Sequence, residues 1–453
     1  MTVTGTSAPT SAPGPPRETA RAARILARCH EIAKHTETAG QITRTFLSPP
    51  MHGVHRLLRG WMEAAGMSTN VDAAGNFRGV YPASREPARR IILGSHLDSV
   101  PNAGAFDGVL GVVMAVAVVE ALENSLPISL EVIGFSEEEG VRFRRPFLGS
   151  LAVIGRLDAA DLALTDAEGI TVADAIRNFG LDPVRISDAK LSANAAAYLE
   201  LHIEQGPVLE HVEQIARRVG HGSFENSARG LAAQQRRAAS TLGVVETIVG
   251  QSRLLFTFQG QANHAGTTPM PLRRDALAAA AEWIVAVETM GRQVPGLVAT
   301  VGRLEADPGA SNVISSLVRA TLDVRHPDDA KRAEAVVDLI ANADAAAHAR
   351  QVLLTHETLL EQPAVQMNAD LVRLLQNAVT SAGHVPRVMP SGAGHDAMIL
   401  APQLPSVMLF LPSPGGLSHH PEEAVLAEDI EAALQTVLEF LRMVSHDKAL
   451  TNA

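Results

Sequence analysis

The chain has 453 residues, 46% of them hydrophobic, and its formal net charge at pH 7 is −11. This length exceeds that of one ordinary domain, so we expect two or three domains, each with an apolar core. The acidic balance argues against a nucleic-acid partner or an anionic membrane surface, and no apolar run approaches the roughly 18–20 residues of a membrane span. The single cysteine, Cys29, excludes an internal disulfide framework and fits a reducing compartment, so we expect a cytoplasmic protein.

The first two hundred residues follow a pattern of alternating elements. Residues 1–16 are rich in Thr, Ser, Ala and Pro and lack the regions of a signal peptide, so we expect a disordered tail. Residues 17–70 place apolar side chains mainly at helical spacing. We then expect strands at 71–81, 91–94, 128–135 and 197–201, and helices at 108–124, 148–154 and 171–179. Such alternation is typical of a doubly wound, mainly parallel sheet covered by helices on both faces.

The pattern changes over residues 250–357. We expect strands at 253–258, 298–303, 317–325 and 351–355, and helices at 275–290 and 328–347. Strand, helix, strand, strand, helix, strand is the order of the ferredoxin-like unit. The earlier pattern resumes with a strand at 406–411 between helices at 369–382 and 427–444. We therefore predict an α/β protein in which residues 17–249 and 358–453 form one domain and residues 250–357 are inserted into it.

A strand end carries the first candidate site. Gly94-Ser95-His96-Leu97-Asp98 places His96 and Asp98 on one face of a strand, because strand side chains alternate. His96 could offer a nitrogen to a metal while Asp98 orients its imidazole, and Asp107 at the next loop-to-helix junction could reach the same cavity. Ligand sites in such sheets collect at the carboxyl ends of strands. The alternative is an ordinary strand followed by a capped helix.

Three further strand ends carry histidine or acidic residues. Ser136-Glu137-Glu138-Glu139-Gly140 places three carboxylates together, which repel one another unless a cation is present. One glutamate could bind a metal while its neighbour acts as general base, although a solvated acidic loop is the alternative. His202 and His419 lie near the ends of two other expected strands. This mixed nitrogen and oxygen set suits a pair of divalent metals such as zinc or manganese.

The motifs resemble those of the di-metal aminoacylase/carboxypeptidase-G-like amidohydrolases. Within that family they resemble the branch of allantoate amidohydrolases, N-carbamoyl-L-amino-acid hydrolases and β-ureidopropionases. The resemblance covers about residues 20–445 and rests on six strings in the family's order. They are Gly-Ser-His-Leu-Asp-Ser at 94–99, Glu-Glu-Gly-x-Arg-Phe at 138–143, His-Ile-Glu-Gln-Gly-Pro-Val-Leu-Glu at 202–210, Asn-His-Ala-Gly-Thr-Thr-Pro-Met at 263–270, Ser-Gly-Ala-Gly-His-Asp-Ala at 391–397 and Ser-His at 418–419.

The resemblance implies a catalytic centre with two divalent ions, which would be zinc, manganese or cobalt. It assigns His96 and His202 to one ion, Glu139 and His419 to the other, and Asp107 to a bridge between them. Glu138 would be the general base, with Asp98 supporting His96. Residues 17–249 and 358–453 would then be the di-metal catalytic domain.

The resemblance also assigns residues to the substrate. His264 would stabilise the oxyanion, typically at the site of a partner subunit, so that residues 250–357 form a lid and dimerisation domain of a homodimer. Asn312 and Arg325, thirteen residues apart, would hold the substrate carboxylate, although Arg325 alone could be a surface arginine. The remaining residues implied to line the ureido pocket are Gln205, Gly394 and His395.

These assignments predict a hydrolase that cleaves the ureido C–N bond of a small carboxylate-bearing substrate. Allantoate is the favoured substrate, and N-carbamoyl-L-amino acids or β-ureidopropionate are the alternatives. An aminoacylase, a peptidase or a non-catalytic scaffold is a further alternative. One departure from the family concerns residues 211–242, a locally basic segment that relatives largely lack. It is either a surface excursion, which loop entropy tolerates, or a lid or interface element that adjusts specificity.

Overall fold

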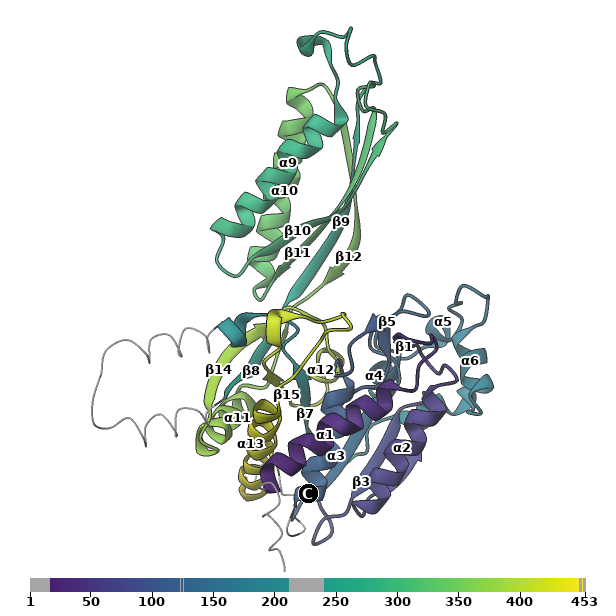
Figure 1. Ribbon diagram of the computed structural model, residues 1–453, viewed down its shortest axis with the longest axis vertical. Helices are drawn as coiled ribbons and strands as arrows, with labels where there is room; N and C mark the ends of the chain where they lie inside the picture. The colour runs from purple at the N-terminus through teal and green to yellow at the C-terminus, as the bar shows by residue number, and fades with distance from the viewer. Residues whose placement is uncertain (1–16, 123, 125, 212–239, 448–449, 451–453) are drawn as a thin grey trace, which may run out of the picture. The chain divides into compact units, whose positions relative to one another are not determined.

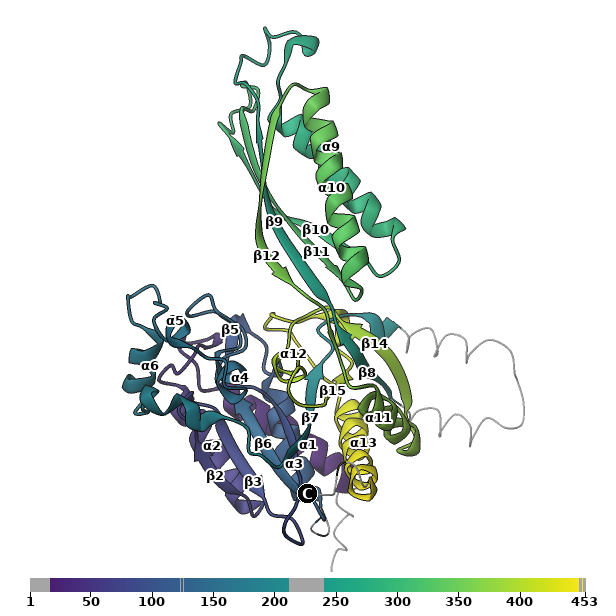
Figure 2. The ribbon, with the colours of Figure 1, turned by 180° about the vertical axis from the view of Figure 1, so that it is seen from behind.

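The computed structural model describes residues 17–122, 124, 126–211, 240–447 and 450 (Figures 1 and 2). The predicted tail at 1–16 and most of the predicted insertion at 211–242 lie outside the described residues. Among those described, none of the helices combines the length and apolar character needed to cross a membrane. The chain folds into two compact units. The first comprises the chain up to Val244, Asn368–Val388 and Gln403–Ala453, and the second comprises Val245–Met367 and Met389–Pro402.

The largest sheet has nine strands, in the order β13-β8-β15-β7-β4-β6-β3-β2, with β14 also paired to β8. Its strands are β2 (Ser68–Val71), β3 (Phe77–Tyr81), β4 (Arg90–His96), β6 (Ser129–Phe135), β7 (Ala195–Ile203), β8 (Thr241–Ile248), β13 (Val365–Gln366), β14 (Val385–Ser391) and β15 (Ser406–Leu411). A separate small sheet joins β1 (Ile42–Arg44) to β5 (Ser99–Ala103).

The helices of the first unit pack on this sheet and on one another. They are α1 (Arg17–Ala33), α2 (Met51–Ala64), α3 (Val109–Ala121), α4 (Leu148–Val153), α5 (Ala159–Leu162), α6 (Val172–Asn178), α11 (Ala369–Ser381) and α13 (Ala427–His446), with 3₁₀ turns η1 (Pro183–Ala189) and η3 (Pro414–Gly416). Helix α3 is buried from Val109 to Val119 and packs on β4, β6 and β7, as well as on α1 and α13. A helix that is apolar all round belongs inside a core.

The centre of the sheet is parallel, which decides where the site forms. Strand β4 pairs in parallel with β6 and β7, and β15 pairs in parallel with β7. The register places His96 opposite Phe135, and His202 opposite Phe410. Because parallel strands point the same way, their carboxyl ends meet at one edge of the sheet. Two of the predicted ligands, which are far apart in sequence, are thereby brought to the same edge.

The α/β class with mixed sheets is confirmed, but several predicted elements are wrong in detail. The expected strand at 71–81 is two antiparallel strands, β2 and β3, separated by a turn. The Asp72 carboxylate closes that turn by accepting the backbone N–H groups of Ala74 and Asn76 at 3.0 and 3.1 Å. Strand β3 pairs antiparallel with both β6 and the edge strand β2, and β1 lies within the range expected to be mainly helical.

The second unit is a four-stranded antiparallel sheet with two long helices on one face (Figures 1 and 2). In chain order it contains β9 (Gly250–Gln259), η2 (Met270–Leu272), α9 (Ala276–Gln293), β10 (Val298–Asp307), β11 (Leu317–His326), α10 (Asp329–Ala349), β12 (Leu353–Gln362) and α12 (Asp396–Leu400). The strand order is β10-β11-β9-β12. Trp283 lies in its core against Phe256 and Phe258, and its indole N–H donates to the Leu339 carbonyl at 3.0 Å.

The limits of this unit differ from those expected from sequence. The expected boundary at residue 357 falls inside β12, which continues pairing with β9 as far as Gln362. Residues 389–402, which contain Gly394 and His395, also pack with the second unit instead of the first.

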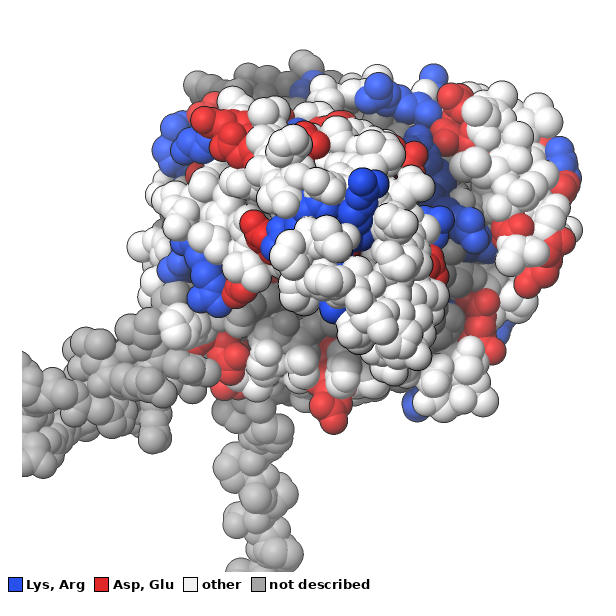
Figure 3. Space-filling model, turned by 90° about the horizontal axis from the view of Figure 1, so that it is seen from above, with Lys and Arg blue, Asp and Glu red and all other residues white. Residues whose placement is uncertain are grey.

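Figure 3 shows one face of the molecule with charged residues coloured, and on this face positive and negative side chains lie interspersed among uncharged ones. Mixed signs of this kind are typical of an ordinary solvated surface. The expectation of no nucleic-acid partner stays a prediction.

Candidate metal centre

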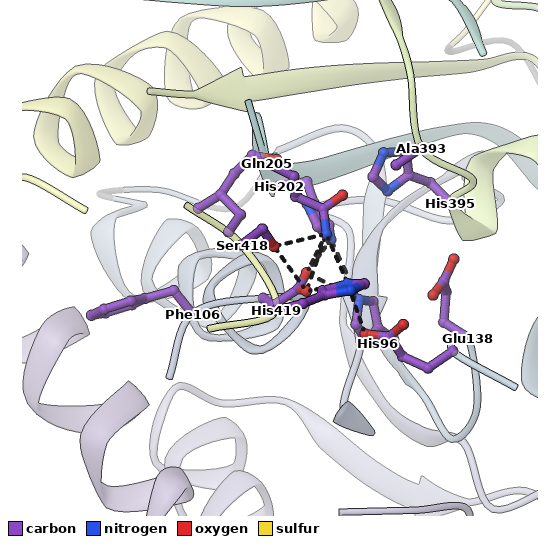
Figure 4. Close-up of polar contacts among 12 residues, drawn as sticks. His96, Phe106, Glu138, His202, Gln205, Ala393, His395, Ser418 and His419 are labelled. Carbon is purple, nitrogen blue, oxygen red and sulfur yellow. Dashed lines mark hydrogen bonds and ion pairs between the residues drawn. The ribbon is translucent and has the colours of Figure 1, made fainter. Parts of the chain in front are cut away.

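Two histidines from neighbouring strands face one buried carboxylate (Figure 4). His96 is the last residue of β4, and His202 lies one residue before the end of β7. Their Nε2 atoms are 3.4 Å apart, and lie 3.7 Å and 3.3 Å from Oδ1 of Asp107. All three side chains are at most 2% exposed.

The other ring nitrogen of each histidine, Nδ1, lies within hydrogen-bond distance of a backbone carbonyl oxygen. Nδ1 of His96 lies 3.1 Å from the Asp98 carbonyl oxygen, and Nδ1 of His202 lies 2.9 Å from the Ile203 carbonyl oxygen. A ring whose Nδ1–H donates to a carbonyl presents Nε2 as its coordinating atom, as metal-bound histidines do. Two nitrogens about 2.1 Å from one ion at a tetrahedral angle lie about 3.4 Å apart. The observed spacing therefore fits a single ion.

The other oxygen of Asp107 faces a second group of possible ligands. Nε2 of His419 lies 3.2 Å from Asp107 Oδ2 and 3.5 Å from Oε1 of Glu139. Asp107 thus offers one oxygen to the His96 and His202 pair and the other to His419 and Glu139. Among the described residues, three groups of possible metal ligands have their atoms within 4.8 Å of one another: His96, Asp107 and His202; His96, Glu138 and Glu139; and Asp107, Glu139 and His419.

Because these carboxylates are buried, they need positive charge close by in order to ionise. Burial, together with the charge of Asp107, raises the pKa of Glu139 to about 7. Burial also opposes ionisation of Asp107, but hydrogen bonds with His419 and His96 outweigh it and hold the pKa of Asp107 well below its usual range. For His202, burial lowers the pKa to about 4, so its imidazole is neutral near pH 7. Carboxylates and a neutral imidazole gathered out of water are the ligand set of a divalent cation.

Two glycines allow the Gly-Ala-Phe-Asp-Gly string to approach its neighbours. Gly108 has φ +63°, and a Cβ there would lie 2.5 Å from the His96 ring. At Gly104, a Cβ would lie 2.4 Å from the Cβ of Glu423. Since α3 begins at Val109, these glycines place Asp107 directly before the helix and against both groups of ligands.

Asp98 has a wider role than the support of His96 that we expected. Its Oδ1 lies 3.4 Å from Nδ1 of His96, farther than the Asp98 carbonyl oxygen does. The same carboxylate accepts the backbone N–H groups of Glu138 and Glu139 at 3.0 and 3.1 Å. Asp98 therefore joins the end of β4 to the acidic turn. Glu137, the third carboxylate of that turn, is fully buried and accepts the Gly140 N–H at 2.5 Å.

Gln205 lies against the bridging carboxylate. It follows β7 with φ +58°, and its side-chain amide donates to both oxygens of Asp107 at 3.1 Å. The same amide nitrogen lies 3.2 Å from the Ser418 hydroxyl. The resemblance implied a place in the ureido pocket, and these contacts place Gln205 at the edge of the metal centre.

Arg325 is held in a fixed orientation within the second unit. Its Nε and Nη2 donate to the two oxygens of Asp323 at 2.8 and 3.1 Å, and Nη1 donates to the Gly392 carbonyl at 2.6 Å. These bonds use three of the five N–H groups of the guanidinium and leave two for a ligand. Gly394 and His395 follow Gly392, and the buried His395 ring lies 2.9 Å from the Ser391 hydroxyl through Nε2.

His264 and Asn312 lie at the opposite end of the same sheet from Arg325. His264 forms an isolated bridge with Val313, and the Ala265 N–H donates to the Asn312 carbonyl at 2.9 Å. This loop lies beyond the first residue of β11, whereas Arg325 lies eight residues along that strand. At about 3.3 Å per residue, the strand separates them by about 26 Å. Asn312 and Arg325 of one chain therefore lie too far apart to hold the same small substrate, and their assignment to the substrate carboxylate stays a prediction.

The chain matches, over residues 92–443, the family model described as Peptidase family M20/M25/M40. It therefore belongs to this peptidase family and is a hydrolase, which confirms the resemblance. Allantoate deiminase 1 of Glycine max is 37% identical, over 93% of this chain and 89% of its own. The N-carbamoyl-L-amino acid amidohydrolase of Geobacillus stearothermophilus is 37% identical, over 88% and 92%. A solved amidase of the hydantoinase/carbamoylase family from Burkholderia multivorans is 31% identical with a TM-score of 0.82, over 93% and 97%.

Metal binding at this centre should release protons. The pKa of His419 is raised to about 9 by its hydrogen bond to Asp107, and the pKa of His96 is raised well above its usual value because hydrogen bonds to Asp107 and Asp98 outweigh burial. Both rings therefore carry protons near neutral pH, and burial keeps Glu139 protonated below about pH 7. An entering cation must displace these protons, so affinity should rise with pH towards about 9.

Calorimetric titration with manganese in two buffers of different ionisation enthalpy measures this release. We expect more protons released per ion below about pH 7 than near pH 8. Binding heats that do not depend on the buffer at either pH would contradict the assignment of these groups as ligands.

Proposed function

We propose that this chain hydrolyses the ureido C–N bond of a small carboxylate-bearing substrate, with allantoate as the first candidate. N-carbamoyl-L-amino acids and β-ureidopropionate are the second candidates, because relatives named for allantoate and for N-carbamoyl-L-amino acids are equally similar to the chain. The observation that carries the proposal is the buried Asp107 carboxylate between two groups of ligands, with Glu138 beside them. An aminoacylase or a peptidase is the alternative within the family.

We propose that the centre holds two divalent ions, which would be zinc, manganese or cobalt. His96 and His202 would hold one, Glu139 and His419 the other, and Asp107 would contact both. When bound, such ions polarise a carbonyl and lower the pKa of a water molecule. The convergence of imidazole Nε2 atoms and carboxylate oxygens on two sides of Asp107 supports this arrangement.

Glu138 is the proposed general base. Glu138 is 8% exposed, and its carboxylate belongs to one group with His96 and Glu139. The turn that carries it is held by Asp98. We propose that Glu138 accepts a proton from the attacking water and then delivers it to the leaving nitrogen, as a carboxylate of a hydrolase does.

The second unit is proposed to recognise the substrate. Arg325 would bind the substrate carboxylate through the two N–H groups that do not donate to Asp323 or Gly392. A planar guanidinium can donate two parallel hydrogen bonds to a carboxylate. We propose that Gln205, Gly394 and His395 line the ureido pocket, as the resemblance implies.

We propose a homodimer, with residues 250–357 as lid and dimerisation domain. A small substrate cannot span the roughly 26 Å along β11 that separates the His264 and Asn312 loop from Arg325. His264, as oxyanion donor, and Asn312 would therefore serve the site of a second chain. Both loop residues are exposed, and the edge strands β10 and β12 carry exposed apolar side chains such as Val298 at 58% and Leu353 at 61%. Unpaired edge strands of this kind are available for pairing.

The substrate is tested by ammonia and product release from manganese-loaded protein. Allantoate, N-carbamoyl-L-amino acids, β-ureidopropionate and N-acetyl amino acids would be supplied in parallel. We expect turnover of ureido acids, with allantoate highest. Turnover of N-acetyl amino acids alone would move the function to the aminoacylase class.

Glu138→Gln should separate the base from the ligands. We expect this variant to keep its metal and lose about 10²–10⁴-fold in kcat, the usual contribution of a general acid or base. Glu139→Gln should lose metal as well, which can be measured by elemental analysis of both variants. If both variants keep their metal and their rate, the acidic turn is only a solvated loop.

Arg325→Ala should lower kcat/KM about 10–100-fold, since hydrogen bonds to a charged group contribute about 1.5–3 kcal/mol. Arg325→Lys should recover part of this, because an ammonium cannot reproduce the planar fork. Arg319→Ala, an exposed arginine of the same strand, is the matched control and should match wild type. With a substrate whose carboxylate is replaced by a neutral amide, wild type and Arg325→Ala should perform alike. An unchanged gap between them would place the carboxylate elsewhere.

The dimer is tested by mixing two inactive variants. His264→Ala and Glu138→Gln chains each lack a different part of the site, so exchange of subunits should restore activity if His264 serves the partner. Light scattering measures the assembly directly. A monomer with full activity would exclude the shared site.

A further inference from the structure

A buried glutamate that none of the preceding roles uses lies beside the metal centre. Glu423 follows His419 by four residues, in the segment that leads to α13, and is only 6% exposed. Burying a carboxylate is costly unless hydrogen bonds compensate it, so its contacts indicate what it holds in place.

One oxygen of Glu423 holds the loop that carries the bridging aspartate. Oε1 accepts the backbone N–H of Phe106 at 3.0 Å and that of Asp107 at 2.9 Å. Hydrogen bonds from two consecutive amides fix the direction of the backbone at this point. Gly104 makes the approach possible, since any side chain there would overlap the Cβ of Glu423.

The other oxygen reaches the segment that carries His419. The hydroxyl of Ser418 lies 3.4 Å from Oε2 of Glu423 and 3.3 Å from Oδ2 of Asp107. Glu423 and Ser418 together therefore connect two segments that are more than 300 residues apart in sequence.

The two groups of ligands are anchored unequally, which makes this connection important. His96 and His202 sit within buried strands, with side chains at most 2% exposed. His419 lies in a turn with φ +55°, and its side chain is 50% exposed. Burial therefore fixes the first group, while the position of His419 relative to Asp107 depends on local hydrogen bonds.

We infer that Glu423 is a positioning residue for the metal centre: its carboxylate holds the backbone of Asp107 and, through Ser418, the turn that carries His419. The inference rests on the proposed two-ion centre. Its consequence is selective, because Glu423 supports the group formed by Asp107, Glu139 and His419 more than the group formed by His96 and His202.

The test is a zinc titration of the metal-free full chain in competition with a chromophoric chelator. Glu423→Ala should weaken one zinc equivalent about 10–100-fold, the usual effect of removing a residue that orients metal ligands. The other equivalent should be weakened less, because buried strands hold His96 and His202 in place. Glu423→Gln should bind both equivalents almost as wild type, because its amide oxygen can still accept the two backbone N–H groups. Glu422→Ala, which removes the same charge from the exposed neighbouring residue, should match wild type.

Several results would overturn the inference. One is that Glu423→Ala binds both zinc equivalents as tightly as wild type. Another is that Glu423→Ala weakens both equivalents equally. The third is that Glu423→Gln binds zinc as weakly as Glu423→Ala. If Glu423→Ala does not fold, Ser418→Ala keeps the Oε1 contacts and should still weaken one equivalent, and no loss in that variant would also overturn it. Wild-type protein that binds no zinc would overturn the proposed metal centre itself, and this inference with it.

Discussion

The structure of the site depends on one constraint: the Asp107 carboxylate is buried between imidazole groups that approach both of its oxygens. One oxygen faces two imidazole nitrogens and the other faces His419, which lies beside Glu139. In a medium of low dielectric, such a group is stable only when positive charge lies between its members. Protons on His96 and His419 can supply that charge, and so can divalent cations. The same arrangement therefore explains both the shifted pKa values and the affinity for metal that we propose.

The fold makes this burial possible by bringing strand ends together. Parallel pairing of β4 with β7 delivers His96 and His202 to one edge, and α3, which begins two residues after Asp107, packs on both strands. The remaining candidate ligands lie on loops, which are held in place by hydrogen bonds. Asp98 holds the acidic turn, and Glu423 holds the loop before α3. Buried strands thus carry the first pair of candidate ligands, and hydrogen-bonded loops carry the others.

The sequence allowed the candidate metal ligands to be chosen because their positions follow a local rule, and the structure gathers them at one centre. A histidine at the end of a buried strand and an aspartate before an apolar helix can be recognised from a few residues, and parallel strands bring such ends together. The family resemblance then assigned a role to each residue. Period-two and helical spacing likewise predicted most strands and helices of both units.

Contacts between distant segments could not be predicted in the same way. Nothing near Glu423 in the sequence indicates that its partners are Phe106 and Asp107, which lie 317 and 316 residues away. The wider role of Asp98 and the position of Gln205 are further contacts of this kind. The spacing of Asn312 and Arg325 was misleading for a different reason. An extended strand holds residues thirteen positions apart at a distance, so Asn312 and Arg325 could meet at one substrate only if they came from two different chains.

The central claim is that Asp107 bridges two metal ions. Anomalous X-ray scattering from crystals of the manganese-loaded protein tests it most directly, because it locates the ions without reference to activity. The account predicts two peaks about 3.5–4 Å apart, the separation of ions in two-metal hydrolytic sites, one on each side of the Asp107 carboxylate. A single peak, or peaks that do not contact Asp107, would contradict it.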